Sequence, residues 1–492
     1  MVGSVGATES LGFGGAPDNT TVTSAPPEVD RALTTELTRL QRELRQPSLS
    51  AAVSRRGRLL WAGAVGHRGR PYAAGASAAP LTSRTTYRIG SITKPMVALA
   101  LVRLAQAGRL DLDEPVRRRR PDWWVGSVTA AQLLSHTSGL RAEPQGSWWE
   151  RAGGPTWDEL CAQPPEFVVP PGGPVRYSNV GYAVLGRLLE SLTGLSWDEA
   201  VRSLVWQPLG MDDTGAAAGV DAAEGMAVHP FADVTHHEPV AEYRAMGPAG
   251  QVWSTPVDVL RLAACLSGHG AGALCLDEPS RRRMTTPVSV WDTPGMPWTT
   301  AQGLGVAIWN DGGRRWLGHT GSVPGFTAEL RISLDTADAA VVCGNATHGH
   351  AASLALLDEL QRVWPAERPP YTPGPVHPAA ASLAELAGGW FWGPIARTVA
   401  VGASQSGTPT LRLYQSNTPT AVTVFEPDGR EWVGVAGGYW YGERLRAQYP
   451  DGGRRGDGNG PAYLDVGTFR LTRRPYQPDA DIPGGVDPGG WS

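Results

Sequence analysis

A proline-rich segment constrains the fold of this 492-residue chain more than any other feature, because it separates two parts with different sequence patterns. Six of the sixteen residues from 365 to 380 are proline. Proline has no backbone N–H and a fixed φ, so neither a helix nor a central strand can continue through such a segment. We therefore predict a semi-rigid linker over residues 366–382, with a separately folding part on each side.

The part before the linker, residues 28–365, has strand signals at both ends and helix signals in between. Residues 48–69 contain two apolar runs around Arg55-Arg56-Gly57-Arg58, a pattern typical of a β-hairpin. Strands are also predicted near 303–310, 314–321, 327–334 and 338–346, and helices near 28–45, 91–108, 181–194 and 353–364. These signals predict an α/β (α+β) domain whose antiparallel sheet is drawn from both ends of the segment and is flanked by helices.

The part after the linker, residues 383–478, repeats short strand patterns at regular spacing. Seven are visible: WFWG, TVAVGA, TLRLYQ, AVTVFEP, EWVGV, ERLRAQ and GTFRLTRR. Turn residues separate them, which predicts a small antiparallel barrel or sandwich. The two ends of the chain differ from both parts: residues 1–27 are polar and rich in glycine and proline, which predicts a disordered leader, and residues 479–492 are predicted to form a surface tail.

Composition and charge argue against several classes of function. A net charge of −4 and a pI near 6.2 disfavour a protein that binds nucleic acid or an anionic membrane. No run of about 18 uncharged apolar residues is present, so no membrane-spanning helix is expected. The first residues have neither the basic nor the apolar segment of a secretory signal, so we expect a cytoplasmic protein, and we expect it to be a monomer.

The four cysteines, Cys161, Cys265, Cys275 and Cys343, lie far apart in the sequence and form no CxxC pair. That spacing is typical of buried free thiols in a reducing compartment and indicates neither a disulfide framework nor a zinc site. His236 and His237 are adjacent, but no third metal ligand lies at a suitable spacing. We therefore expect neither a metal nor another cofactor.

Lysine is almost absent from the chain: of its 43 basic residues, 42 are arginine and one, Lys94, is lysine. Arginine is always protonated in proteins, whereas a buried lysine can lose its proton and act as a base. A position that keeps lysine in a chain that otherwise uses arginine is therefore a candidate for chemistry. The alternative is an ordinary surface lysine that has survived by chance.

Lys94 follows Ser91 by three residues at the start of the strongest predicted helix. Residues at i and i+3 share a helix face, so a neutral Lys94 would lie where it can take a proton from the Ser91 hydroxyl. The helix N-terminus disfavours a charged lysine, and its free N–H groups near Ser91 can bind a developing oxyanion. Ser91 is therefore a candidate nucleophile, although an S-x-x-K string alone also arises often by chance.

Tyr177 and Asn179 form a second candidate group, in PGGPVRYSNVGY just before a predicted helix. A tyrosine phenol can relay a proton if a nearby cation lowers its pKa, and an asparagine can orient the lysine or donate to a substrate carbonyl. The alternative for this pair is a capping asparagine beside a packing tyrosine.

His319-Thr320-Gly321-Ser322 forms a third candidate group, at the end of a predicted strand. Glycine at a strand edge allows a substrate backbone to approach closely. The N–H group of Ser322 could then be the second oxyanion donor, and His319 could donate a hydrogen bond or carry charge near the site. The alternative for His319 is a histidine on the surface of the strand.

The three groups together resemble the serine penicillin-recognising family, which includes penicillin-binding proteins, class C β-lactamases and related esterases and D-aminopeptidases. The family order is S-x-x-K, Y-x-N and then K/H-[TS]-G, and this chain has these motifs at 91, 177 and 319. LLSHTSGL at 133–140 and GPAGQVWSTPVDVLRLA at 247–263 are also similar to the class C branch. The resemblance covers about residues 28–365 and implies a β-lactamase-like transpeptidase fold.

The resemblance also implies a role for each matching residue. Ser91 would be the nucleophile, Lys94 and Tyr177 the proton-transfer pair, and Asn179 a positioning residue. The oxyanion hole would consist of the N–H groups of Ser91 and Ser322. One residue departs from the pattern: His319 stands where β-lactamases carry a lysine that grips the substrate carboxylate, and histidine is mostly neutral at pH 7. This departure favours the esterase, peptidase and acyltransferase members over the β-lactamases.

The second domain resembles the lipocalin-like barrel that follows the catalytic domain in several such hydrolases. One subgroup with this layout is the penicillin-binding-protein-type thioesterases, which take a peptidyl thioester from a carrier protein and join it head to tail. The resemblance therefore implies macrocyclisation and release of a nonribosomal peptide, with a peptidyl carrier protein as partner. The alternative is a D-stereospecific peptidase or carboxylesterase; a β-lactamase or an inactive binding module is a lesser one.

Two further sets of residues are candidates for contact with substrate. Cyclisation needs a wide, dry cleft, and tryptophans could line it: Trp148, Trp149, Trp253 or Trp298. In the second domain, the predicted strand GTFRLTRR carries Arg470, Arg473 and Arg474. One of them, with Arg473 as our candidate, could hold a peptide carboxylate or carbonyl; solvated strand ends are the alternative.

Overall fold

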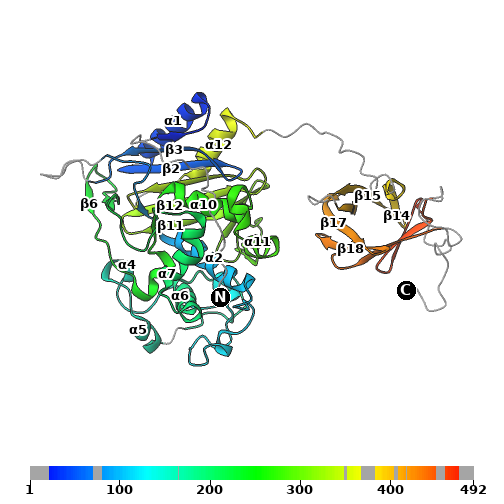
Figure 1. Cartoon of the computed structure of the whole chain (residues 1–492), viewed down its shortest axis with the longest axis horizontal. Coiled ribbons are helices and arrows are strands. Elements are labelled where there is room, and N and C mark those ends of the chain that lie inside the picture. Colours follow the sequence, from blue (N-terminus) through cyan, green and yellow to red (C-terminus); the bar gives the residue numbers. More distant parts are fainter. Residues whose placement is uncertain are drawn as a thin grey trace, which may run out of the picture. The chain divides into compact units, whose positions relative to one another are not determined.

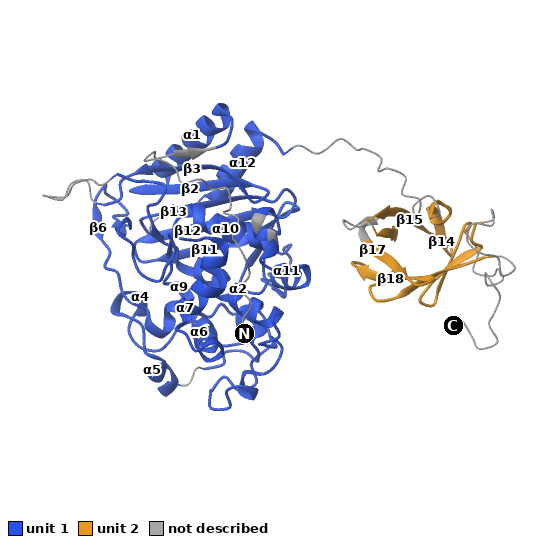
Figure 2. Ribbon diagram, viewed as in Figure 1, with its two compact units in different colours: residues 1–367 blue, residues 368–492 orange. Residues whose placement is uncertain are grey.

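The computed structural model describes residues 21–69, 80–163, 166–347, 352–366, 383–403, 408–416, 418–449 and 460–475. They belong to two compact units, residues 1–367 and residues 368–492 (Figure 2). Residues 1–20 of the predicted leader, residues 367–382 of the predicted linker and the predicted tail all lie outside the described residues. Within the predicted leader, however, Thr21–Thr23 form strand β1 and Pro27 begins the first helix.

A nine-stranded antiparallel sheet forms the centre of unit 1 (Figure 1). In spatial order its strands are β1 (Thr21–Thr23), β3 (Arg58–Gly66), β2 (Ser48–Arg55), β13 (Asp338–Gly344), β12 (Phe326–Ser333), β11 (Arg314–Val323), β10 (Ala307–Asp311), β9 (Thr300–Gln302) and β8 (Ser289–Val290). β13 pairs with β2, with Val341 opposite Ala52, so the late strands add directly to the early hairpin. This arrangement confirms the predicted antiparallel sheet drawn from both ends of the segment.

Two apolar cores lie on the two faces of this sheet. The main helices around it are α1 (Pro27–Glu43), α2 (Thr93–Gln106), α6 (Asn179–Thr193), α10 (Pro256–Ser267) and α12 (Ser353–Val363). Along β13, Ala340 and Val342 share a core with α1 and α12, whereas Val341 and Cys343 share a core with α2, α6 and α10. This alternation follows the two-residue period of a strand and explains why β13 is apolar from Ala339 to Cys343.

Short elements connect the sheet and the main helices. The short helices are η1 (Gly90–Ile92), η2 (Val116–Arg118), α3 (Ala130–Leu134), α4 (Trp149–Ala152), α5 (Trp157–Ala162), α7 (Trp197–Val201), the π-helical turn η3 (Arg202–Trp206), α8 (Gln207–Leu209), η4 (Arg244–Met246), α9 (Gly247–Gly250), η5 (Gly270–Leu274) and α11 (Glu278–Thr285). Two two-stranded sheets add β4 (Tyr87–Arg88) with β7 (Trp253–Ser254), and β5 (Met226–Val228) with β6 (Thr235–His237).

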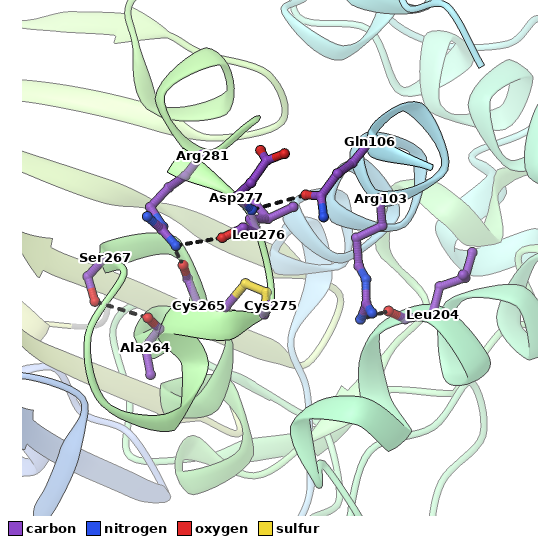
Figure 3. The surroundings of a disulfide bond; sticks show 10 residues. All are labelled: Arg103, Gln106, Leu204, Ala264, Cys265, Ser267, Cys275, Leu276, Asp277 and Arg281. Atoms are coloured by element: carbon purple, nitrogen blue, oxygen red, sulfur yellow. Dashed lines mark hydrogen bonds between the residues drawn. A yellow bond between two sulfur atoms is a disulfide. The ribbon is translucent and has the colours of Figure 1, made fainter. Parts of the chain in front are cut away.

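Cys265 and Cys275 form a disulfide (Figure 3), so the prediction that all four cysteines are free thiols is wrong for this pair. α10 ends at Gly268 in the left-handed region, and the chain returns through η5 against the helix it has just left. This reversal brings the two Cα atoms to 5.7 Å, a separation that a disulfide can bridge. Cys161 and Cys343 are free. The cysteines therefore no longer support the expected reducing compartment.

Unit 2 is a closed eight-stranded antiparallel barrel. Its strands are β14 (Gly388–Trp392), β15 (Ile395–Ala403), β16 (Pro409–Gln415), β17 (Thr418–Asp428), β18 (Glu431–Ala436), β19 (Arg444–Gln448), β20 (Tyr463–Val466) and β21 (Phe469–Thr472), and η6 (Ala384–Leu386) precedes them. The pairing of Phe391 with Thr472 closes the ring. The predicted all-β architecture is confirmed as a barrel. The seven predicted strands lacked β20.

Candidate active site

Ser91 and Lys94 are hydrogen-bonded to each other at the N-terminal end of α2. Ser91 lies in the 3-10 turn η1, immediately before α2, rather than in the first turn of the α-helix itself. The hydroxyl of Thr93 donates to the carbonyl of Gly90 at 2.7 Å and stabilises this turn. Lys94 Nζ donates to Ser91 Oγ at 2.9 Å and to the carbonyl oxygen of Ala249 at 2.6 Å. The three-residue spacing thus brings the hydroxyl and the amine together as predicted.

Lys94 is completely buried, which decides its protonation state. Burial lowers the pKa of Lys94 to about 7, because the ammonium loses its hydration, and the charges of Glu143 and Glu150 oppose this change. Nζ lies 4.8 Å from the ring centre of Tyr177 and 5.3 Å from that of Tyr182. A large fraction of the lysine is therefore neutral near pH 7 and able to accept the proton of Ser91.

This pKa predicts the pH dependence of acylation. Only neutral Lys94 can take a proton, so the rate of Ser91 labelling by a fluorophosphonate should fall about tenfold per pH unit below pH 7 and level off above it. Burial lowers the pKa values of the two buried histidines of the site below their ordinary range, to about 4 for His319. The measurement is the second-order labelling rate from pH 5 to pH 9, and a flat profile would contradict the assignment.

Tyr177 lies beside this pair with its phenol protonated. Burial raises its pKa far above 10, and a hydrogen bond with Ser91 opposes the rise only partly. The condition set for a proton relay, a pKa lowered by a nearby cation, is therefore not met, because burial of the phenol outweighs the effects that lower its pKa. A neutral phenol can donate a proton to a leaving group, so Tyr177 suits the role of an acid better than that of a base.

Asn179 is the first residue of α6, but it does not cap the helix. The cap is Ser178, whose Oγ accepts from the N–H of Gly181 at 3.0 Å. Asn179 Nδ2 donates to Glu143 Oε1 at 2.7 Å, and Glu143 Oε2 accepts from Trp149 Nε1 at 2.8 Å. The Asn179 Oδ1 atom is shielded from solvent and has no hydrogen-bond partner in the described part of the chain. The orientation of this amide is therefore set by Glu143, a residue that the sequence did not indicate.

The His319–Val323 half of β11 pairs with β12 on one edge and lies against η1 on the other. β10 pairs with β11 only as far as Gly318. A Cβ atom on Gly321 would lie 2.0 Å from the carbonyl oxygen of Ile89 and 3.1 Å from the nitrogen of Ser91. A Cβ on Gly90 would lie 2.9 Å from the nitrogen of Ser322. The backbones that carry the two predicted oxyanion donors are thus in direct contact, and glycine is needed on each side of it.

His319 is buried and uncharged, so it is not the surface histidine of the alternative interpretation. It is 4% exposed, and burial lowers its pKa to about 4, with a further contribution from Lys94. Its Nδ1 donates to the carbonyl of Thr320 at 2.6 Å. The side chains of Thr320 and Ser322 lie on the opposite, exposed face of β11. The third motif therefore brings no positive charge to the site at neutral pH.

The family model described as β-lactamase matches residues 33–362. The chain belongs to the β-lactamase family. A second family model, described as a domain of unknown function (DUF7586), matches residues 379–473 of this β-lactamase-family protein, which is the barrel unit. The family and the fold predicted from the three motifs are therefore confirmed.

Relatives of this β-lactamase-family protein include penicillin-binding proteins and esterases. Penicillin-binding protein 4 of Amycolatopsis lactamdurans is 29% identical over 345 residues, which cover 63% of this chain and 85% of the relative. Esterase EstB of Burkholderia gladioli is 37% identical over 196 residues, 35% of this chain and about half (48%) of the esterase. The protein is a serine hydrolase or acyltransferase of this family, as the motifs predicted.

The fold of this chain is also similar to that of several solved structures. The crystal structure of SurE aligns with 91% of this chain and 99% of its own, with a TM-score of 0.57 and 24% identity. D-amino acid amidase from Ochrobactrum anthropi SV3 aligns with 68% of this chain and 99% of its own, with a TM-score of 0.57 and 23% identity. At these identities the likeness concerns the fold alone.

A pocket of about 390 Å³ lies beside Tyr177 in this β-lactamase-family protein. Its walls include apolar side chains: Leu140, Val168, Val175 and the half-exposed Trp291. Trp149 and Trp253, two of the tryptophans proposed for the cleft, are buried in the core instead. No local signal distinguished Trp291 in the sequence, because its position depends on a loop between β8 and β9.

Arg473 lies in the barrel unit, directly after β21. Its guanidinium donates to the carbonyl oxygens of Ala387, at 2.9 Å, and Gly389, at 3.2 Å, and also to that of Glu385. It also lies 3.8 Å above the ring of Trp390. The neighbouring Arg470 pairs with Asp465. These contacts stabilise the start of the barrel, and they give the predicted role of Arg473 in substrate binding no support.

No group of three or more His, Cys, Asp or Glu side chains in the described ranges is placed to hold a metal ion. Within the same part of the chain, every helix is too short or too polar to cross a membrane.

Proposed function

We propose that the protein transfers an acyl group through an ester on Ser91. The observation that carries this proposal is the hydrogen bond between Ser91 and a buried Lys94 whose pKa lies near 7. Ser91 Oγ attacks the substrate carbonyl while its proton moves to Lys94 Nζ, and the oxyanion is held by the N–H groups of Ser91 and Ser322. The proton then passes to the leaving group, with the neutral phenol of Tyr177 as its carrier, and the acyl-enzyme remains.

The neutral third motif supports a particular class of acyl donor. β-Lactams and peptides with a free C-terminus bring a carboxylate close to the scissile bond, and His319 has no charge at pH 7 to bind it. A thioester or an ester has no carboxylate at this position. We therefore propose a peptidyl thioester, presented by a peptidyl carrier protein, as the donor, and the amine of the same peptide as the group that resolves the acyl-enzyme. The product is a macrocycle.

Hydrolysis is the second candidate, and a specific observation favours it. Esterase EstB is 37% identical to this chain over 196 residues, so water can be the group that resolves the acyl-enzyme. In that case the protein is a carboxylesterase or a D-stereospecific peptidase. The intact Ser91–Lys94 pair disfavours an inactive binding module. The neutral His319 disfavours a β-lactamase.

The experiment follows the products of a linear peptidyl thioester that ends in a D-residue. Purified protein is incubated with several such peptides, and the products are weighed by mass spectrometry. A cyclic product, smaller than the linear acid by one water, supports the cyclase. Linear acid alone from every peptide would count against cyclisation and for the hydrolase. The Ser91→Ala variant should form neither product, and turnover in that variant would contradict the acyl-enzyme itself.

A further inference from the structure

His136, which follows α3, contacts the segment Arg176–Ser178 in three ways. Its carbonyl oxygen accepts from the N–H of Arg176 at 2.7 Å, and its Nδ1 accepts from the N–H of Ser178 at 3.1 Å. Its ring stacks on the ring of Tyr177, with centres 4.2 Å apart and an angle of 29° between the planes. One residue thus binds the backbone on both sides of Tyr177 and also supports its ring.

The backbone of His136 is held in an unusual conformation to make these contacts. Its φ is +57°, in the left-handed region that side chains other than glycine seldom adopt. Such a conformation is strained and persists where the surrounding structure fixes it. Here the N–H of His136 donates to Leu133 and the N–H of Thr137 donates to Gln132, so the turn is held on both sides. This turn points both acceptors of His136 toward the segment that carries Tyr177.

The ring of His136 is neutral, and its acceptor role requires this. Because Nδ1 accepts a hydrogen bond, the ring proton is on Nε2, which is shielded from solvent and has no partner in the described ranges. Burial lowers the pKa of His136 well below 6.5, and Lys94 and His319 lower it further. A protonated ring could not accept from Ser178, so the burial that keeps the ring neutral also preserves the contact.

We propose that His136 is a positioning residue that holds the phenol of Tyr177 beside Ser91 and Lys94. It does so through its carbonyl oxygen, its Nδ1 atom and the face of its ring. The proposal rests on the proposed acyl transfer, because it assigns His136 no contact with the reacting atoms. It explains why a histidine occupies this strained backbone position, although its Nε2 atom has no hydrogen-bond partner in the described part of the chain. It also assigns a role to the histidine of the HTSGL string at 136–140, which belongs to none of the three motifs.

Two substitutions distinguish the contribution of the Nδ1 acceptor of His136 from that of its stacked ring. His136→Asn keeps an acceptor near the position of Nδ1, and asparagine tolerates a positive φ. His136→Phe keeps a stacking ring and removes the acceptor. For hydrolysis of a simple activated ester, we expect His136→Phe to lower kcat about 10- to 100-fold with KM within about twofold, because misplacement by about 1 Å can cost that much. His136→Asn should recover most of kcat, to within about threefold of the unsubstituted protein.

The controls separate positioning from folding and from the function itself. Thermal unfolding of each variant is measured, with the exposed His269→Phe as a matched exchange that should leave kcat unchanged. An unchanged kcat in His136→Phe, or a loss that only follows the unfolded fraction, would overturn the proposal. If that variant does not fold, His136→Gln, which moves the acceptor away from Ser178, should show the same loss of kcat. Turnover by Ser91→Ala would instead overturn the proposed function, whatever the His136 variants do.

Discussion

Replacing Lys94 with arginine is expected to abolish acylation of Ser91, although the positive charge is kept. A guanidinium has a pKa above 12 and cannot accept a proton at any pH at which the protein is folded. Loss of a general base of this kind costs about 10²- to 10⁴-fold, so we expect kcat/KM for an activated ester to fall about 10³-fold. The measurement is ester turnover together with the rate at which a fluorophosphonate labels Ser91.

The matched control for this exchange is Arg103→Lys on the same helix. Arg103 donates to the carbonyl of Leu204, away from Ser91, so the reverse exchange should leave turnover within about twofold. A second variant, Lys94→Ala, leaves a cavity beside Ser91, and added small primary amines should restore part of the rate. Turnover by Lys94→Arg within tenfold of the unsubstituted protein would refute the neutral-base role.

Gly321→Ala is expected to have the second largest effect, a fall in kcat of about 10²- to 10³-fold, equal to the loss of an oxyanion donor. The new Cβ would lie 2.0 Å from the carbonyl oxygen of Ile89 and 3.1 Å from the nitrogen of Ser91. Both are backbone atoms, so they cannot rotate away as a flexible side chain would. β11 and η1 must separate, and the N–H groups of Ser91 and Ser322 can then no longer converge on one oxygen.

The control for this variant is Gly219→Ala, because a Cβ on Gly219 meets nothing within 4 Å and its φ is not in the left-handed region. That variant should keep the unsubstituted kcat. For Gly321→Ala, the initial rate of acylation and the unfolding temperature are measured together. A normal acylation rate in a folded Gly321→Ala protein would show that the contact between β11 and η1 does not form the oxyanion hole.

The sequence predicted those parts of the site that depend on short-range spacing. Ser91 and Lys94 are three residues apart, and a helical turn alone brings them together. The late strands and the barrel were also predictable, because alternating apolar residues and turns are local signals. The order of the three motifs then indicated the family without knowledge of their distances in space.

The remaining parts depend on contacts between distant segments. His136 meets Tyr177 only because the turn after α3 folds against the segment before α6, and nothing near His136 in the sequence marks this contact. The disulfide depends on the reversal between α10 and η5, which the spacing of Cys265 and Cys275 does not reveal. The protonation of Tyr177 depends on burial, and burial becomes known only when the chain is folded. These three features therefore depend on tertiary structure rather than on local propensity.

Lys94 is the only lysine of the chain and is completely inaccessible to solvent in the folded protein. Reagents that modify lysine side chains therefore have no accessible lysine while the fold is intact. Labelling or surface attachment through lysine should fail on the native protein and succeed after unfolding. Modification of this one amine thus reports the opening of the catalytic unit, and a peptide map that locates the label on Lys94 would distinguish opened molecules from native ones.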